Sequence, residues 1–377
     1  MFYLDNLLIR GFRNYRQQQL QFNPRLNIVI GKNAQGKTNL LESIYYLSVN
    51  RSFRTNRDQD LANWDDNFFF VKGVFFKDGF EHTAQASYRE KDQLKVVINN
   101  NPANRYDHLQ LFPVVVFSPD DLQIIREGPS IRRRFINLEA SRLDPVYFKD
   151  LKAYQRVLLQ RNHLLKEKHH PGKINELLEP WDQSLTSLGS SIIQTRLEII
   201  DALEKEAHQF FAIMTDSQEK LSLDYISTVE YSTDPIETKY IFLKALLAKR
   251  DQEIKRGITL LGPHLDDLRI SINGYDTRYY SSQAQKRTAA LALKMAEVNL
   301  FKKQNCDCPI ILLDDVFSEL DNYRKEHLLS FLKNTSGQCF ITTAVDFHSL
   351  GDKLHGEKKI FSVYQGSIAD ETVKLSS

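Results

Sequence analysis

The octapeptide GKNAQGKT, residues 31–38, decides the fold of this chain. It follows the apolar run LNIVI and precedes TNLLESIYYL, in which the apolar residues recur at helical spacing. A glycine-rich loop between a strand and a helix lets successive backbone N–H groups point at one anion, and the helix adds its positive N-terminal end. The stretch therefore predicts a phosphate-binding P-loop within an α/β protein.

Each position of the loop has an expected role in holding a nucleotide. Lys37 supplies a positive charge to the β- and γ-phosphates, and the hydroxyl of Thr38 is a magnesium ligand. The flanking glycines allow the tight turn. The alternative is a chance match in an ordinary turn, against which the flanking strand and helix argue. The candidate ATP contacts are Gly31, Lys32, Asn33, Ala34, Gln35, Gly36, Lys37 and Thr38.

A second motif, PIILLDDVFSELD, begins at residue 309 and ends a buried strand in two carboxylates. Asp314 stands at the strand tip, where it can hold Mg²⁺ or its waters together with Thr38. Asp315 is placed to orient or deprotonate the attacking water. One acidic residue after an apolar run is usually structural, but two in a chain with a P-loop predict catalysis. Asp314, Asp315 and Lys37 are therefore the candidate catalytic residues.

A third motif, SSQAQKR at residues 281–287, precedes a strong helix. Ser281 or Ser282 can serve as N-cap, so the first N–H groups of the helix form another anion site. This site could face the γ-phosphate of a nucleotide in another subunit. Taken alone, the motif is an ordinary capped helix.

The whole chain fits a two-lobed globular protein. It has 377 residues, of which 42% are hydrophobic and 26% charged, with a formal net charge of +2. No apolar run reaches the roughly 18 residues that span a bilayer, and the first residues lack a signal-peptide layout, so we expect a cytoplasmic location. Three cysteines form neither a disulfide framework nor a zinc pattern.

Strand patterns and helix patterns alternate along the chain in three blocks. Short apolar runs before residue 31 and the runs within residues 67–101 predict strands, the latter an antiparallel meander. Helical spacing dominates residues 130–256, with two helices folded back at HHPGK. Strands return in LRISING and TRYYS, followed by the helix TAALALKMAEVNLF and strands at residues 310–313 and 339–343. We therefore predict an ATPase lobe at 1–125 and 258–377 and an inserted helical lobe at 126–257.

With its three motifs in this order, the chain resembles the ABC/SMC class of P-loop ATPases, and its short helical insertion resembles the RecF family within that class. Blocks that carry this resemblance include LLIRGFRNY, VVVFSPDDL, GPSIRRRFIN, TLLGPHLDD and SQAQKRTAALALKMAE. The resemblance implies a mixed-sheet head with an antiparallel β meander and a helical lobe without a long coiled coil. In this class residues 281–287 correspond to the signature, 309–315 to Walker B and 318–321 to the D-loop.

The family's function is implied by the same resemblance. ATP and Mg²⁺ would close a homodimer on DNA, with Ser282 and Gln285 of one copy contacting the nucleotide of the other. Hydrolysis would be weak, regulatory and coupled to DNA release. The implied partners are RecO, RecR and single-stranded, gapped or junction DNA without sequence preference, in recombinational repair and replication-gap processing.

Three departures from the family's motifs bear on detail. Ala284 stands where the signature usually has glycine, and its methyl group could crowd the γ-phosphate and slow hydrolysis. Leu265 replaces a usual arginine in GPHLDD. The switch histidine of ABC transporters is missing, which leaves Thr343 as a weak substitute.

Contact with DNA is the least visible function in the sequence. Basic clusters lie at Arg51, Arg54 and Arg57, at Arg132, Arg133 and Arg134, and at Lys249, Arg250, Lys255 and Arg256. Each can be a DNA-backbone contact or a solvated face. Two other functions stay open: a transporter ATPase subunit, which needs a coupling surface for a membrane partner, and an ATP-gated nuclease, for which little chain remains after Asp321.

Overall fold

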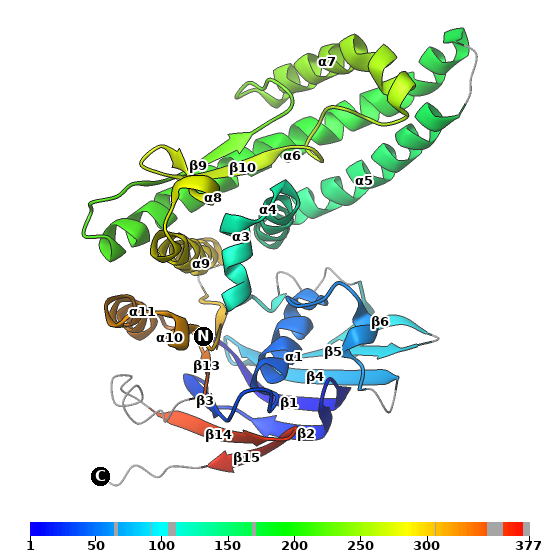
Figure 1. The fold of residues 1–377 in the computed structure, drawn as a ribbon. Coiled ribbons are helices and arrows are strands. Elements are labelled where there is room, and N and C mark those ends of the chain that lie inside the picture. Colours follow the sequence, from blue (N-terminus) through cyan, green and yellow to red (C-terminus); the bar gives the residue numbers. More distant parts are fainter. Residues whose placement is uncertain are drawn as a thin grey trace. The chain divides into compact units, whose positions relative to one another are not determined.

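A computed structural model describes residues 1–63, 67–90, 92–104, 111–167, 171–305, 307–344 and 357–371. The chain folds into two compact units, drawn in Figure 1. Unit 1 comprises residues 1–122 and 290–377, and unit 2 comprises residues 123–289. Both ends of the chain thus contribute to one unit, and unit 2 is an insertion.

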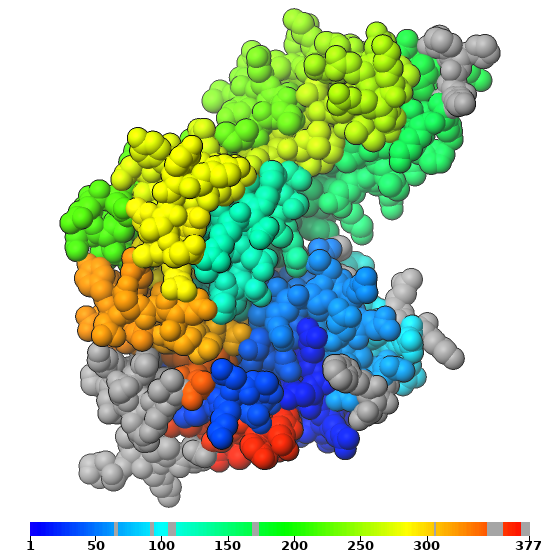
Figure 2. All heavy atoms as spheres, in the orientation of Figure 1, coloured from blue at the N-terminus to red at the C-terminus, as the bar shows by residue number. Residues whose placement is uncertain are grey.

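The first sheet of unit 1 carries the P-loop. Its strand order is β15-β14-β3-β13-β12-β8, and all strands except β15 run parallel. The central strands are mostly apolar because both faces of a parallel sheet are covered. The bounds are β3 Leu26–Ile30, β8 Val114–Phe117, β12 Ile310–Asp314, β13 Cys339–Thr343, β14 Lys358–Tyr364 and β15 Ser367–Glu371. In Figure 2 the red atoms of β14 and β15 lie against blue N-terminal atoms, as the pairing of β14 with β3 requires.

The second sheet of unit 1 is antiparallel, in the order β2-β1-β4-β5-β6-β7. Helix α1 (Lys37–Val49) contacts strands of both sheets and is buried on nearly all sides, which explains why its sequence is apolar around most of its circumference. The bounds are β1 Phe2–Phe12, β2 Tyr15–Gln21, β4 Phe68–Lys77, β5 Phe80–Arg89, β6 Asp92–Ile98 and β7 Asn101–Ala103.

Short helices complete unit 1. They are η1 Asp58–Leu61, η2 Pro119–Asp121, α10 Val316–Glu319 and α11 Asn322–Asn334. Helices α3 (Leu122–Arg126) and α9 (Gln283–Asn305) each cross a boundary between the units.

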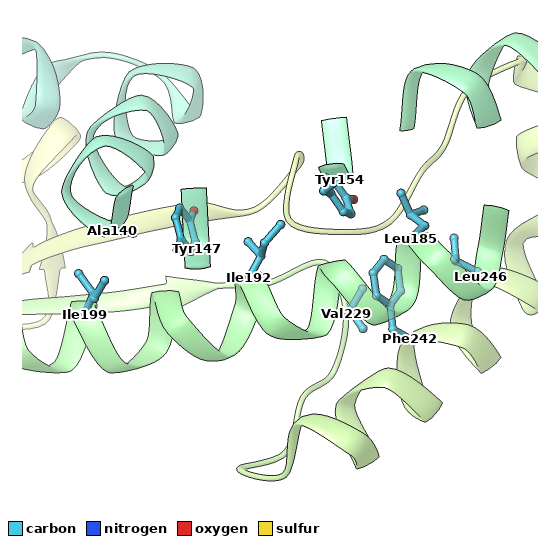
Figure 3. Close-up of a cluster of buried hydrophobic side chains, with 9 residues drawn as sticks. All are labelled: Ala140, Tyr147, Tyr154, Leu185, Ile192, Ile199, Val229, Phe242 and Leu246. Atoms are coloured by element: carbon cyan, nitrogen blue, oxygen red, sulfur yellow. The ribbon is translucent and has the colours of Figure 1, made fainter. Parts of the chain in front are cut away.

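Unit 2 is mostly helical. Its helices are α4 Pro129–Leu143, α5 Pro145–Lys166, α6 Pro171–Met214, α7 Pro235–Arg256 and α8 Thr277–Tyr280. A small antiparallel sheet, β11-β10-β9, packs on α6; its strands are β9 Leu221–Ile226, β10 Asp267–Ile272 and β11 Tyr275–Asp276. Figure 3 shows the core between these elements, where Tyr154, Leu185 and Phe242 meet from α5, α6 and α7.

The predicted fold class is confirmed: an α/β head with a parallel sheet, an antiparallel meander and a helical insertion without a long coiled coil. The predicted pair of helices is present as α5 and α6. Of the HHPGK turn, residues 169 and 170 lie outside the described part, and PGK is not a turn but the start of α6. The last residues, 372–377, also lie outside it.

Two details of the sequence prediction differ from the structure. The second unit boundary lies at residues 289/290 rather than 257/258, because β10 and β11 pair with β9 and so extend unit 2. TRYYS is not a strand: Asp276 accepts a hydrogen bond from the Arg278 N–H, and this cap starts the helix α8. Strands β9, β14 and β15 were not predicted.

Candidate nucleotide site

The P-loop lies between β3 and α1, as its sequence predicts. Two of its residues have positive φ, Ala34 at 64° and Gly36 at 121°. Gly31 is required for a different reason: a Cβ atom there would lie 2.6 Å from the carbonyl oxygen of Val363 in β14. The glycines of the motif thus serve both the turn and its close packing on a neighbouring strand.

Lys37 reaches back across the loop. Its Nζ donates to the carbonyl oxygens of Gly31, at 2.6 Å, and Lys32, at 3.0 Å. Burial lowers the pKa of Lys37, while the negative charges of Asp315 and Asp314 oppose that shift. The side chain is a cation held inside the loop close to two carboxylates.

Asp314 ends β12 and links the two motifs. Its Oδ1 accepts a hydrogen bond from Thr38 Oγ1, at 2.9 Å, and another from Thr342 Oγ1, at 2.9 Å. Burial raises the pKa of Asp314, and the two hydroxyl donors lower it again. The structure therefore brings both predicted magnesium ligands into direct contact.

Asp315 stands in the left-handed region, at φ 51°, as the residue before α10. Its backbone N–H donates to Thr342 Oγ1, at 2.9 Å. One threonine hydroxyl of β13 therefore accepts from one acidic residue and donates to the other. This conformation turns the chain sharply, so β12 ends at Asp314 and Asp315 does not continue the strand.

The predicted signature lies in unit 2, at the start of α9. Ser282 Oγ accepts from the Gln285 N–H, at 3.2 Å, and Gln285 Oε1 accepts from the Ser282 N–H, at 2.7 Å. This capping box selects Ser282 over Ser281 as the N-cap. Gln285 also donates to Glu219, while Ala284 is exposed. The first turn of α9 is thus ordered by its own side chains.

Sequence reasoning missed residues that touch the P-loop from the β1–β2 turn. Asn14 Nδ2 donates to the carbonyl oxygen of Gln35, at 2.9 Å, and Tyr15 Oη donates to that of Gly36, at 2.8 Å. It also missed Thr342. The block LLIRGFRNY was noticed for its resemblance alone, and no local pattern announces that its last residues meet a loop twenty positions later.

Three residues of the basic clusters have partners within their own units. Arg132 is buried and forms two hydrogen bonds with the carboxylate of Asp267, at 2.8 and 2.7 Å. It is neither a solvated face nor a DNA contact. Arg54 donates to Asn39 Oδ1, at 2.9 Å. Arg250 pairs with Asp182 and has little exposed surface.

Two features are absent from the described residues. No helix there is long and apolar enough to cross a membrane. Nor does that part of the chain hold a group of three or more His, Cys, Asp or Glu residues suited to a metal ion. Cys308 and Cys339 are free and buried, and burial raises their pKa to about 11 and about 12.

Comparisons with known proteins agree on one family. The family described as RecF/RecN/SMC N terminal domain matches residues 3–365. The chain is 40% identical to the DNA replication and repair protein RecF of Halothermothrix orenii, over 97% of this chain and 98% of the relative. It is 36% identical to RecF of Bacillus subtilis, over 91% and 94% of the two chains.

Solved structures give the same result. The recombination mediator protein RecF-ATP of the RecFOR pathway matches with a TM-score of 0.90 and 35% identity, covering 98% of this chain and 99% of that one. A Pyrococcus furiosus Smc head domain matches with a TM-score of 0.56 at 16% identity, covering 98% and 96%, and this likeness concerns the fold alone.

Three features together define an ABC/SMC-like ATPase head. They are the parallel sheet, the hydrogen bond from the P-loop to the carboxylate at the end of β12, and the inserted helical unit. Within that class, the chain belongs to the RecF family.

Proposed function

We propose that the chain binds ATP at residues 31–38 and hydrolyses it slowly with Lys37, Asp314 and Asp315. The observation that carries the proposal is the 2.9 Å hydrogen bond from Thr38 Oγ1 to Asp314 Oδ1, which joins motifs 276 residues apart. ATP in the RecF-ATP relative supports the choice of nucleotide. Lys37, now bonded to loop carbonyls, would turn to the β- and γ-phosphates.

Mg²⁺ fits the residues present. Thr38 and Asp314 offer two adjacent oxygens, the ligand type that Mg²⁺ prefers, and phosphates and water would supply the remaining ligands. Bound Mg²⁺ would neutralise phosphate charge. Asp315 would orient or deprotonate the attacking water.

We further propose that ATP closes a homodimer on DNA and that hydrolysis releases it. Ser282 and Gln285 of one copy would contact the nucleotide bound to the other. RecO and RecR would be partners in loading recombinase at gaps, and the location would be the cytoplasm. The relatives' role in DNA replication and repair and the RecFOR pathway supports this part.

The test uses two variants. Lys37→Met should lower ATP affinity by about 100-fold and abolish ATP-driven dimerisation and DNA retention. Asp315→Asn should bind ATP normally yet hydrolyse it more than tenfold slower, trapping a closed dimer. Asparagine tolerates the left-handed backbone of position 315, which makes this variant conservative.

Three readouts decide the outcome: nucleotide affinity by calorimetry, dimer mass by light scattering, and retention on gapped and fully duplex DNA with ATP, with ADP and without nucleotide. A Lys37→Met protein that dimerised on ATP and held DNA like the wild type would refute the proposal. Co-sedimentation with membranes instead of DNA would favour the transporter-subunit alternative. A steep loss of DNA binding with salt is expected for contacts to phosphates.

A further inference from the structure

The turn between β14 and β15 lies against the P-loop. Its two residues, Gln365 and Gly366, have φ of 45° and 73°. The Gly366 N–H donates to the carbonyl oxygen of Gln35, at 3.1 Å. The Gln365 N–H donates to the side-chain oxygen of the same residue, at 2.7 Å. A C-terminal turn thus binds both the backbone and the side chain of one P-loop residue.

The same carbonyl oxygen accepts a second hydrogen bond, from Asn14 Nδ2 at 2.9 Å. A carbonyl oxygen has two lone pairs, so both acceptor positions of Gln35 are used. The peptide between Gln35 and Gly36 is planar and trans, so its C=O and N–H point in opposite directions. Fixing the oxygen toward the two turns therefore aims the Gly36 N–H away from them.

Glycines let the three segments approach this closely. A Cβ atom on Gly366 would lie 2.3 Å from the carbonyl oxygen of Asn14. One on Gly36 would lie 2.7 Å from Asn14 Nδ2, and one on Gly31 would lie 2.6 Å from the carbonyl oxygen of Val363. The contacts at Gly366 and Gly31 are with backbone oxygens, so a larger residue there must push the turns and the loop apart, whereas at Gly36 the Asn14 side chain must shift.

We propose that the β14–β15 turn is a positioning element of the nucleotide site. The Gly366 N–H and Asn14 hold the Gln35–Gly36 peptide so that the Gly36 N–H already faces the phosphate position before a nucleotide arrives. Such preorganisation increases affinity because no conformational freedom is lost on binding. The inference rests on the proposed binding of a nucleotide at residues 31–38 and adds the C-terminal hairpin to that site.

Unit 1 contains a matched control for this turn. The β4–β5 turn has similar φ angles, with Asp78 at 52° and Gly79 at 83°. A Cβ atom on Gly79 would meet nothing within 4 Å. Alanine at either glycine suffers the same backbone strain, and only alanine at 366 meets the β1–β2 turn.

The experiment compares Gly366→Ala with Gly79→Ala and the wild type. Affinity for ADP is measured by calorimetry, because ADP binding is not linked to ATP-driven dimerisation, and thermal unfolding is measured alongside. Both variants should lose thermal stability, since both place a Cβ atom at positive φ, and Gly366→Ala should lose more because its Cβ atom also meets the β1–β2 turn. ADP affinity should fall about tenfold in Gly366→Ala and stay unchanged in Gly79→Ala.

A second variant removes a contact without adding atoms. Gln35→Met deletes the acceptor of the Gln365 N–H and should weaken ADP binding about threefold with little change in thermal stability. Equal ADP affinity of the wild type, Gly366→Ala and Gln35→Met would overturn the inference while leaving the proposed function standing. Wild-type and Gly79→Ala proteins that both failed to bind any nucleotide would instead overturn the proposed function. If Gly366→Ala does not fold, Gln35→Met decides alone.

Discussion

The two units use buried polar groups in different ways. In unit 1, short side chains and backbone groups converge on the P-loop: Thr342 serves both Asp314 and Asp315, and Asn14 fixes a loop carbonyl. In unit 2, by contrast, large arginine side chains are buried. Arg132, Arg161 and Arg196 are all nearly inaccessible and paired within the unit.

The two units differ in what their buried polar groups stabilise. Arg161 of α5 bonds Asp182 of α6, Glu253 of α7 and Thr259 in the following loop, so a single guanidinium ties together the elements of the helical unit. Arg250 adds a second cation to Asp182, so two positive charges balance two negative ones. Ion pairs and hydrogen bonds thus hold the helices of unit 2 together, whereas the polar contacts around the P-loop of unit 1 orient a loop and two carboxylates.

The largest expected effect comes from breaking the cross-link in unit 2. Arg161→Met removes a fully buried guanidinium and leaves Glu253 as an unpaired buried carboxylate. Removing one partner of a buried ion pair costs about 3–5 kcal/mol of the free energy of unfolding. We expect faster hydrogen exchange throughout α5, α6 and α7, with nucleotide affinity of unit 1 preserved.

The control for Arg161→Met is an ion pair on the same helical unit that lies in water. Lys205 pairs with Asp201 at 2.6 Å, with both side chains more than half exposed (69% and 62%). Lys205→Met should change the free energy of unfolding by less than about 1 kcal/mol in urea unfolding. Equal losses in the two variants would show that the buried network stabilises unit 2 no more than an exposed ion pair does.

How much could be predicted from the sequence depends, in both units, on whether a feature is local in the chain. The P-loop and β12 were predictable because a local pattern defines each: a glycine spacing, and an apolar run ending in carboxylates. An N-cap at Ser281 or Ser282 was predictable for the same reason, and the structure selects Ser282. A pattern within one short segment is therefore enough to predict each of these features.

Contacts between distant segments could not be predicted. Arg132 was a candidate for DNA contact because a run of three arginines resembles a basic surface, but its partner Asp267 lies 135 residues away. The β14–β15 hairpin was overlooked although IFSVY and SIADE flank a Gln-Gly turn, a pattern typical of hairpins. The hairpin therefore had a recognisable signal in the sequence. The Arg132–Asp267 salt bridge had none, because a salt bridge produces no periodic pattern in a sequence.

A smaller effect is expected where one hydroxyl orients the carboxylates of unit 1. Thr342→Val keeps the shape of the side chain but removes the donor to Asp314 and the acceptor of the Asp315 N–H. Leaving that N–H without its partner should cost about 1–2 kcal/mol in the free energy of unfolding. The pKa of Asp314 should rise further because one of its two hydroxyl donors is lost.

The functional consequence of Thr342→Val is a lower affinity for Mg-ATP, with a larger deficit at acidic pH, because a protonated Asp314 cannot bind Mg²⁺. Measurements of Mg²⁺ dependence at pH 6 and pH 8 check this. Thr342→Ser retains the hydroxyl and should restore most of the affinity. A valine variant with wild-type Mg²⁺ dependence at both pH values would show that β13 does not orient the site.

The smallest expected effect is on the pH dependence of stability, which has opposite signs in the two units. In unit 1, burial raises the pKa of Asp121 from 3.8 to about 6, against the opposing charge of Lys294. The folded state therefore binds more protons than the unfolded state between these pH values, and unit 1 loses stability as the pH rises from about 4 to about 6. In unit 2, burial lowers the pKa of His264 from 6.5 to about 4. Unit 2 therefore loses stability as the pH falls through that range.

Asp121→Asn tests the first half of this pair. Asparagine keeps an oxygen for the Ser118 N–H, which Asp121 accepts at 2.7 Å, but carries no charge. We expect a gain of about 1 kcal/mol at pH 8 and little change near pH 4, less than the full pKa shift implies because the side chain is only half-buried. Hydrogen exchange resolved by segment should show the gain in unit 1 alone. Because acid weakens unit 2 while base weakens unit 1, the difference in stability between the two units, measured by exchange in the wild type, should change with pH; a difference that stayed constant between about pH 4 and about pH 7 would contradict this prediction.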